Sequence, residues 1–165
     1  MKMLNKKIGN QTVKLSNSPK IIATYSIVGP KEGEGPISEY FDEILNDDTL
    51  GKESFEKAES QMMFTAISES LKKAKLEETD IDYLFSGDLL NQIISSSFAA
   101  REFSIPFFGL YGACSTMAES LSLASIIMDG GFANYVVATT SSHFSSAERQ
   151  FRFPLEYGSQ RCETA

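Results

Sequence analysis

The stretch FFGLYGACSTMAESLSLASIIMDGGFANYVVATT, residues 107–140, decides the fold of this chain. It predicts a strand over residues 107–110, a sharp turn over 111–114, a helix over 115–129 and a second strand over 135–140. Apolar side chains occur almost all the way round this helix, which is typical of a helix buried inside a domain. Short apolar strands on either side of a helix indicate a βαβ unit in a parallel sheet, with a right-handed crossover. We therefore expect an α/β fold with a mixed, mostly parallel sheet and a buried central helix.

Cys114 lies in the turn that leads into this helix, between the small residues Ala113 and Ser115. Small residues let the backbone turn tightly, and the start of a helix presents unpaired N–H groups and the positive end of the helix dipole. Such a position stabilises a thiolate or a bound carboxylate. Cys114 is therefore the first candidate site residue, and the other candidates are considered relative to it.

The apolar spacing outside this stretch predicts the remaining elements. Strands are predicted over residues 11–15, 21–28 and 81–86, a loop over the Gly- and Pro-rich residues 29–36, and a short helix or turn over residues 41–50. Ser54 is placed to cap a long helix whose apolar face extends to Ala74. The length of 165 residues fits one domain.

Asp88 and Asn91 follow the strand predicted over residues 81–86. Asp88 is placed to cap the next helix, which would give it a structural role. The alternative is that both side chains form a polar wall of a ligand site, because ligands in open α/β sheets bind outside the carboxyl ends of the strands. The sequence leaves both interpretations open.

His143 comes at the carboxyl end of the strand predicted over residues 135–140. Cys114 follows what we take to be the neighbouring strand, so we expect both side chains on the same rim of the sheet. A Cys/His pair is the minimum for thiolate chemistry. A single histidine is as readily a hydrogen-bonded structural residue, and the sequence does not decide between the two.

Arg149 and Arg152 lie three residues apart among aromatic neighbours. Salt bridges or a contact between subunits would explain them without a ligand. The alternative is that they recognise a carboxylate, because the guanidinium group can bind a carboxylate through two parallel hydrogen bonds.

The composition argues against several classes of function. The net charge is −7 and Lys and Arg are not clustered, whereas nucleic-acid binding needs clustered basic residues to contact phosphates. No apolar run of signal-peptide length follows Met1, and no stretch approaches the roughly 20 apolar residues of a membrane span. Cys114 and Cys162 provide no disulfide framework, and with one histidine we expect no zinc site.

The strand, the GACST turn and the helix resemble the nucleophile region of the thiolase-like fold, which thiolases and ketoacyl synthases share. More narrowly, the chain resembles the stage V sporulation protein AD family of spore-forming bacteria. Five blocks carry this resemblance, in order: GPKEGEGP (29–36), GDLLNQ (87–92), GACST (112–116), DGGFA (129–133), and TSSH (140–143) with AERQFR (147–152). The resemblance covers about the first half of the family's length, so we expect residues 1–165 to be the N-terminal half of a thiolase-like domain. The family tends to carry a proline where Cys162 stands, which leaves Cys162 without an implied role.

The resemblance implies a ligand-binding role without catalysis. Members of the family bind dipicolinic acid, the pyridine dicarboxylate that spores store with calcium, and act with membrane subunits of the stage V sporulation A complex. Carried over to this chain, the ligand pocket would have Cys114 at its floor, His143 on its rim, Asp88 and Asn91 nearby, and Arg149 or Arg152 as carboxylate partners. The resemblance further implies a homodimer in the forespore or spore, peripheral to the inner spore membrane, with no cofactor.

Two other functions remain open. Cys114 could be the nucleophile of a thiolase-like or ketoacyl-synthase-like acyltransferase, with N–H groups of its turn as oxyanion donors. Thiolase-like catalysis usually draws further His, Asn or Cys groups from the second half of the fold, and in this chain only His143 could serve. Alternatively, the fold could be a structural scaffold in which the ancestral site is vestigial.

Overall fold

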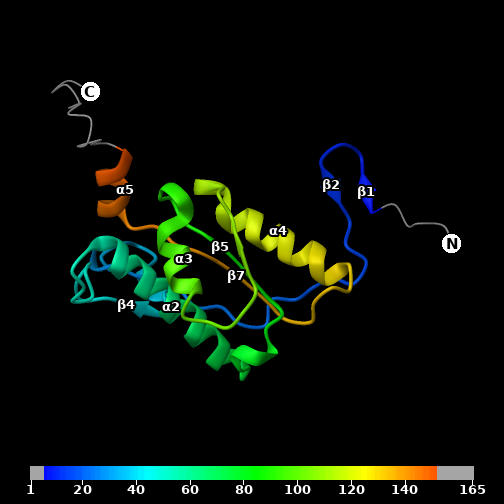
Figure 1. Cartoon of the computed structure of the whole chain (residues 1–165), viewed down its shortest axis with the longest axis horizontal. Coiled ribbons are helices and arrows are strands. Elements are labelled where there is room, and N and C mark those ends of the chain that lie inside the picture. Colours follow the sequence, from blue (N-terminus) through cyan, green and yellow to red (C-terminus); the bar gives the residue numbers. More distant parts are fainter. Residues whose placement is uncertain (1–5, 152–165) are drawn as a thin grey trace.

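A parallel sheet forms the centre of the molecule in the computed structural model, which describes residues 6–151 except for the side chains of Arg149 and Phe151 (Figure 1). Its strands are β5 (Tyr83–Gly87), β6 (Phe107–Gly109) and β7 (Val136–Thr140), in the order β6-β5-β7. β5 is the middle strand and pairs in parallel with both neighbours. The predicted α/β class with a parallel sheet is confirmed.

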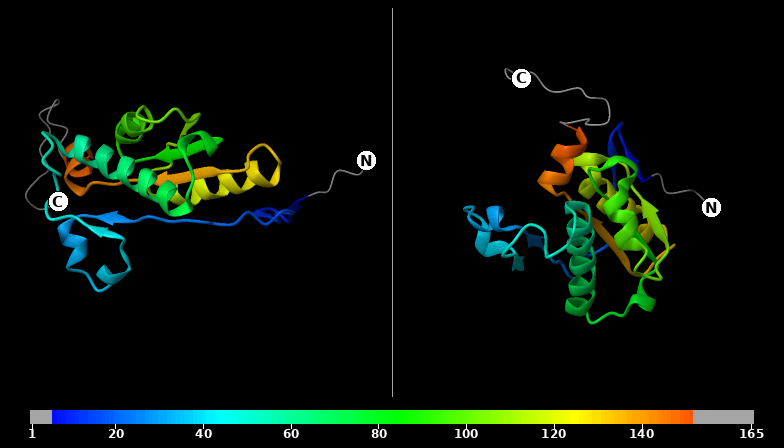
Figure 2. Two further views of the ribbon diagram at one scale, coloured as in Figure 1. Left: turned by 90° about the horizontal axis from the view of Figure 1, so that it is seen from below. Right: turned by 60° about the vertical axis from the view of Figure 1, so that its left-hand side comes forward.

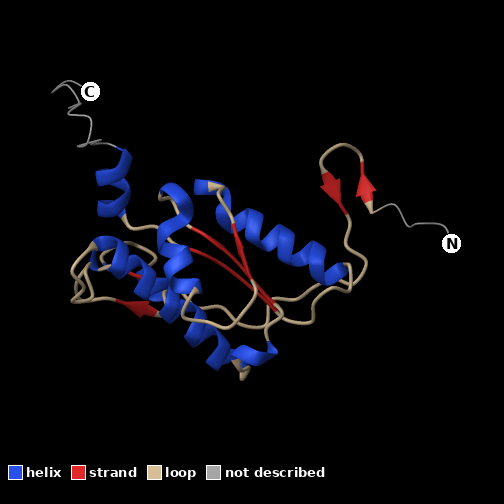
Figure 3. Ribbon diagram, viewed as in Figure 1, coloured by secondary structure: helices blue, strands red, loops and turns tan. Residues whose placement is uncertain are grey.

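Helices cover both faces of this sheet (Figure 3). The longer helices are α2 (Phe55–Ala74), α3 (Ile94–Ala100), α4 (Thr116–Asp129) and α5 (Phe144–Phe151). The connection through α3 runs from β5 to β6, and the connection through α4 runs back from β6 across β5 to β7. The first connection moves from β5 toward one edge of the sheet, and the second moves back toward the other edge. Because both are right-handed crossovers, α3 and α4 lie on opposite faces of the sheet.

The apolar core follows the alternation of side chains along β5. Leu84 faces α2 and α3, where it joins a cluster that includes Met63 and Ile67. Phe85 points to the other face and packs with Ala124 of α4. Successive side chains of a strand point to opposite faces, so this middle strand is buried on both sides.

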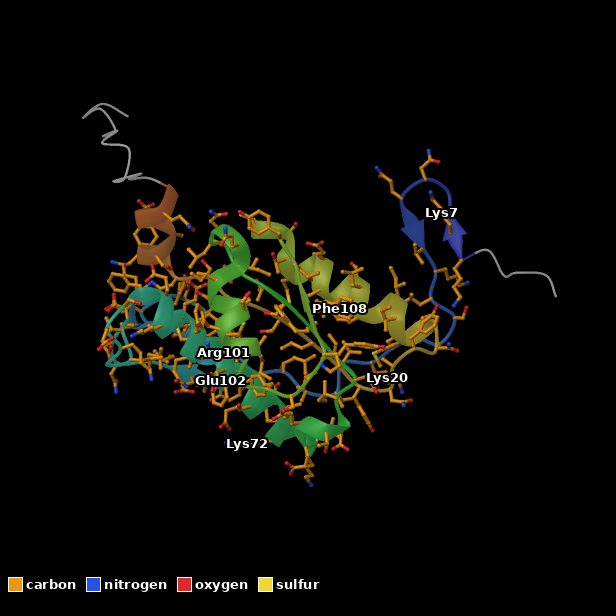
Figure 4. The ribbon with its side chains drawn as sticks, viewed as in Figure 1. Lys7, Lys20, Lys72, Arg101, Glu102 and Phe108 are labelled. Carbon is orange, nitrogen blue, oxygen red and sulfur yellow. The ribbon has the colours of Figure 1, made fainter. Side chains whose placement is uncertain are left out.

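α4 is covered by the sheet on one side only, which differs from the prediction of an all-round buried helix. On its two flanks, Met117 and Leu121 on one and Ile126 on the other, these side chains are 43%, 38% and 48% exposed. The aromatic side chain of Phe108, labelled in Figure 4, is also half exposed although it stacks on Phe85 at 5.1 Å between ring centroids. The helix was therefore placed correctly in the sequence, and within the described residues these side chains are left partly exposed.

The cap predicted at Ser54 is confirmed. Its hydroxyl accepts a hydrogen bond from the N–H of Lys57 at 3.3 Å at the start of α2. α2 ends at Lys75, which takes a left-handed backbone conformation with φ +58°. Buried side chains recur along this helix at Met63, Ile67 and Leu71, four residues apart, as expected for one face of a helix.

Four short elements were not predicted with their bounds. They are β1 (Lys7–Ile8), β2 (Thr12–Val13), β3 (Ile27–Val28) and β4 (Glu43–Ile44). β1 and β2 form an antiparallel hairpin, and β3 pairs in parallel with β4. Most of the predicted strand 21–28 is extended chain outside any ladder, and it runs along the length of the molecule (Figure 2).

Two predictions between residues 29 and 50 were wrong. The expected loop over residues 29–36 contains the one-turn helix α1 (Pro30–Gly33), because Pro30 at its first position has a backbone already suited to a helix. The expected short helix or turn over residues 41–50 contains β4. Beside the paired strands β3 and β4, the hydroxyl of Tyr25 donates to the carboxylate of Glu43 at 2.9 Å. This hydrogen bond is the main cause that raises the pKa of Tyr25 to about 12.

Short 3-10 turns complete the structure between the longer elements. They are η1 (Ser38–Tyr40), η2 (Glu78–Asp80), η3 (Asn91–Ile93) and η4 (Ala113–Ser115). The helix expected directly after Asp88 begins only at Ile94, because Gln92 and Ile93 take left-handed conformations with φ +61° and +46°.

Asp129 anchors the N-terminal hairpin to the end of α4. Its carboxylate accepts hydrogen bonds from the Lys6 ammonium and from the N–H groups of Ser16 and Asn17, each at 2.6 Å. The Lys6 hydrogen bond, followed by the Asn17 N–H bond, holds the pKa of Asp129 below its usual range. A group with a lowered pKa stabilises the fold above its unfolded-state pKa and loses that contribution as the pH falls through its folded-state pKa.

We therefore expect the hairpin to detach in acid. Amides of residues 6–17 should be protected from hydrogen exchange at pH 7 and lose protection as the pH falls through the lowered pKa of Asp129, while β5 stays protected. Asp129→Asn should remove this protection already at pH 7. Asp47→Asn, in an exposed turn, is the control, and unchanged hairpin protection in Asp129→Asn would contradict the anchor.

Candidate functional site

Three loops meet at the carboxyl edge of the sheet, and together we call them the carboxyl rim. They are residues 88–93 after β5, residues 110–115 after β6 and residues 141–146 after β7. Because the three strands are parallel, their carboxyl ends lie at one edge, which is where α/β proteins bind ligands. All sequence-predicted site residues within residues 6–151 lie in this rim or in the adjoining α5.

Cys114 lies in η4, directly before α4, and its side chain is exposed and free. The preceding residue, Ala113, has φ +48°, a conformation that costs a residue with a side chain about 1 kcal/mol or more. No side chain caps the N-terminus of α4. The N–H of Thr116 already donates to the Ala113 carbonyl, so an anion beside the accessible thiol would meet the N–H groups that follow it and the positive end of the helix dipole.

Asn91 is linked to the turn that carries Cys114 by a hydrogen bond with Tyr111. The Tyr111 hydroxyl donates to the Asn91 side-chain oxygen at 3.3 Å, and the Asn91 N–H donates to Oε1 of Gln150 in α5 at 2.7 Å. The Asn91 and Tyr111 side chains are exposed. This cluster joins the loop after β5, the loop after β6 and the helix that carries Arg149.

Asp88 is buried at 1% exposure, and its two carboxylate oxygens are occupied within the fold. Oδ1 accepts the N–H of Leu90 at 2.8 Å, and Oδ2 accepts the N–H of Ser96 at 2.7 Å. Ser96 lies in the first turn of α3, so Asp88 holds the start of this helix from the preceding loop. The N-cap position itself is Ile93, which makes no side-chain cap hydrogen bond, so the prediction that Asp88 is the cap residue was wrong.

His143 is 8% exposed and is also hydrogen-bonded within the fold. Its Nδ1 accepts the N–H of Ser145 at 3.2 Å, which leaves Nε2 as the nitrogen that donates to the Asp48 carbonyl at 2.7 Å. The ring packs against Phe55 at 4.9 Å between centroids. Both imidazole nitrogens are therefore engaged by residues away from Cys114.

Cys114 and His143 share the carboxyl rim, as predicted, but they do not follow neighbouring strands. β5 lies between β6 and β7, so two inter-strand spacings, about 10 Å in all, separate the strands that carry them. The expectation of adjacent strands was wrong because a βαβ pattern fixes parallel direction but does not say whether another strand lies between.

The two arginines are only partly placed. Arg149 belongs to α5, but its side chain is not described, and Arg152 and Cys162 lie outside the described residues.

Glu119 is a neighbour of the Cys114 turn that the sequence analysis did not single out. Its carboxylate occupies the space next to Gly112, so an acidic group lies near the N-terminus of α4.

A groove of about 620 Å³ lies along β7, between that strand and the extended segment 19–27. Its walls come mainly from apolar side chains of α2 and α4, with Glu59 and Ser141 at its border. Cys114, Asn91 and His143 do not line it. Glu59 was overlooked in the sequence, although its spacing of four residues before Met63 places it on the buried face of α2.

Two features of the described residues concern metals and membranes. Residues 6–151 hold no group of three His, Cys, Asp or Glu side chains that could bind a metal ion. Among the same residues, no helix combines the length and apolar character needed to span a bilayer.

Comparison with known proteins identifies a family that this chain matches. Residues 9–165 match the family described as stage V sporulation protein AD (SpoVAD). The stage V sporulation protein AD of Bacillus subtilis (strain 168) is 43% identical over 157 residues, which cover 95% of this chain and 46% of the relative. The chain thus spans about half the length of that curated relative.

Among solved structures, the 3-oxoacyl-[acyl-carrier-protein] synthase III of Aquifex aeolicus VF5 is similar, with 22% identity and a TM-score of 0.46. The similarity covers 54% of this chain and 31% of the synthase chain. A likeness of this size carries no argument about chemistry.

Proposed function

The chain belongs to the stage V sporulation protein AD family, and on that premise we propose that it is a dipicolinate-binding subunit that acts in sporulation and germination. The observation that supports this best is the N-terminus of α4, which no side chain caps and which lies beside the exposed Cys114. A helix N-terminus favours carboxylates because its N–H groups and its dipole both complement negative charge.

The rim offers complementary chemistry for an aromatic dicarboxylate. One carboxylate would meet N–H groups in the first turn of α4, and the exposed ring of Tyr111 would pack on the pyridine ring. Asn91 would donate a hydrogen bond, and Arg149 or Arg152 would pair with the second carboxylate. Asp88 and His143 would act through the loops that they fix, since their own polar atoms are bonded within the fold.

The wider assembly is part of the same proposal. We expect residues 1–165 to form the first half of a thiolase-like domain, whose second half would cover Met117, Leu121 and Ile126 on α4. The protein would be a homodimer in the forespore or spore, peripheral to the inner spore membrane. It would bind dipicolinate with or without calcium and act with membrane subunits of the stage V sporulation A complex.

Acyl transfer is the second candidate, and the exposed thiol of Cys114 at a helix N-terminus favours it. Binding without catalysis is preferred because both His143 nitrogens are engaged by Ser145 and Asp48. Saturating acyl-CoA should therefore leave no acyl mass on the Cys114 peptide. An acylated Cys114 would instead support the enzyme.

Calorimetric titration of dipicolinate into the purified chain is expected to show saturable binding. Glu119→Gln should bind about 1.4-fold to fivefold more tightly, because removing a partly exposed like charge is worth about 0.2–1 kcal/mol. Bound ligand should also slow alkylation of Cys114 by iodoacetamide, read on the Cys114 peptide so that Cys162 does not contribute.

Glu102→Gln is the matched control, because it makes the same chemical change outside the proposed site. Glu102 lies beside Arg101 just after α3, at the end of that helix away from the carboxyl rim. Its affinity should equal that of the unmodified chain. Absence of saturable binding would reject the ligand and leave a scaffold role. Binding without protection of Cys114 would reject the site while retaining the ligand.

A further inference from the structure

Glu59 is a carboxyl group inside the protein that the proposed ligand site does not use. It belongs to α2 and is 1% exposed. Its side chain faces residues 141–146, which join β7 to α5 in the carboxyl rim and include the first three residues of α5; we call them the turn 141–146. α5 packs beside the N-terminal end of α2 (Figure 2).

Two serine hydroxyls of this turn contact the carboxyl group. The Ser141 hydroxyl lies 2.8 Å from Oε1, and the Ser146 hydroxyl lies 3.0 Å from Oε2. Among the residues that the structure describes, no lysine or arginine forms an ion pair with Glu59. The other ionisable groups facing this region are Asp88, from the loop after β5, and His143, in the turn itself.

Counting hydrogens indicates which form of Glu59 fits these contacts. The Ser146 hydroxyl lies 3.0 Å from Glu59 Oε2 and 2.9 Å from the His143 carbonyl oxygen. Both neighbours accept hydrogen bonds if Glu59 is ionised, yet a hydroxyl has one hydrogen to donate. The His143 carbonyl has a partner in either form, because it also accepts the Ala147 N–H at 3.1 Å. A protonated Oε2 would donate to Ser146, whose own hydrogen could then go to the His143 carbonyl, so that both short contacts of Ser146 become hydrogen bonds.

Burial acts in the same direction as this hydrogen count. An ionised carboxylate without a cation is unfavourable in the interior, and burial is the main cause that raises the pKa of Glu59. Hydrogen bonds from Ser141 and Ser146, and to a lesser degree from Ser95 of α3, partly oppose the rise in the pKa of Glu59, while the nearby negative charge of Asp88 adds to it.

We infer that Glu59 is a neutral, protonated carboxyl that fixes the turn 141–146 to α2, and that loss of its proton loosens this turn and α5. Glu59 is thus a positioning residue for the carboxyl rim. The inference rests on the contacts of Glu59 and does not depend on which ligand the rim binds.

The direction of the pH effect follows from the raised pKa. A raised folded-state pKa means that the stabilising contribution is complete below the unfolded-state pKa of the carboxyl and is lost as the pH rises through the folded-state pKa.

The loosening would reach the proposed binding surface through α5. Gln150 of this helix accepts the N–H of Asn91, so release of the turn would weaken the contact between α5 and the loop after β5. Any ligand that uses Asn91 or Arg149 would then bind with a proton dependence set by Glu59.

Hydrogen exchange on the whole, ligand-free chain tests the inference. Corrected for intrinsic rates, protection of residues 141–151 should fall by up to about tenfold per pH unit above the pKa of Glu59, because one proton is released on opening. Glu59→Gln, which mimics the neutral carboxyl, should keep its protection as the pH rises. Glu69→Gln, on the same helix but paired with Lys72, should behave like the unmodified chain.

Infrared difference spectra give a second readout that does not require a variant to fold as well as the parent chain. As the pH rises through the pKa of Glu59, the unmodified chain should lose the carbonyl band of a buried carboxylic acid, and Glu59→Gln should lack that band. Absence of the band in the unmodified chain would overturn the inference. Equal pH dependence of exchange in Glu59→Gln and the unmodified chain would overturn it as well.

Discussion

Gly87→Ala is expected to destabilise the protein by about 3 kcal/mol, the upper end of the range for forcing extra volume into a packed interior. A Cβ atom at Gly87 would lie 2.1 Å from the Leu110 carbonyl oxygen and 2.9 Å from the Thr116 methyl group. The first contact is with backbone, which cannot move aside without displacing β6. Gly87 also ties the rim together, because its carbonyl accepts the Thr140 hydroxyl at 3.1 Å and the Ser141 N–H at 3.3 Å.

Urea denaturation measures this effect through the midpoint of unfolding. Gly29→Ala is the matched control, because a Cβ there meets no atom within 4 Å, and its stability should change by less than about 0.5 kcal/mol. Because the strain would displace the Cys114 turn, Gly87→Ala should also alter the alkylation rate of Cys114. A variant as stable as Gly29→Ala would show that β5 and the Cys114 turn are not packed as described.

Asp88→Ala is expected to cost about 2–6 kcal/mol, because it leaves the N–H groups of Leu90 and Ser96 without partners, at about 1–3 kcal/mol each. Both N–H groups are in buried surroundings, where water cannot replace the carboxylate. The loss should appear as a lower unfolding midpoint even without ligand.

Asp82→Ala is a matched control for burial. Asp82 also accepts two backbone N–H groups, from Asn134 at 2.6 Å and Tyr135 at 3.1 Å, but at an exposed site. Water can replace this carboxylate, so we expect a cost below about 1 kcal/mol. If Asp88→Ala kept full stability and lost only dipicolinate binding, Asp88 would be a ligand contact and its role at the start of α3 would be minor.

The candidate site could be predicted only in part from the sequence. The position of Cys114 before α4 follows from a local pattern of small residues and helical spacing, and the structure places it there with an exposed thiol. The environment of His143 could not be predicted, because its partner Asp48 lies 95 residues away. Asn91 and Gln150 meet across 59 residues, for which the sequence holds no periodic signal.

The sequence by itself determined the elements whose signals are local. These are the strand, turn, helix and strand of residues 107–140, the helix α2 that begins after the Ser54 cap, and the α/β class. Spacing of 2 or 3.6 residues reports which face of an element is apolar, and capping residues report where a helix begins.

Only the tertiary structure decided the strand order, the two-residue ladders β1–β2 and β3–β4, the attachment of Asp129 to the hairpin and the burial of Glu59. Each of these depends on which segment lies opposite another, and the energy of that choice comes from hydrogen bonds and packing between residues distant in the chain. A periodic pattern is the same whichever partner covers it, so it could not place β5 between Cys114 and His143.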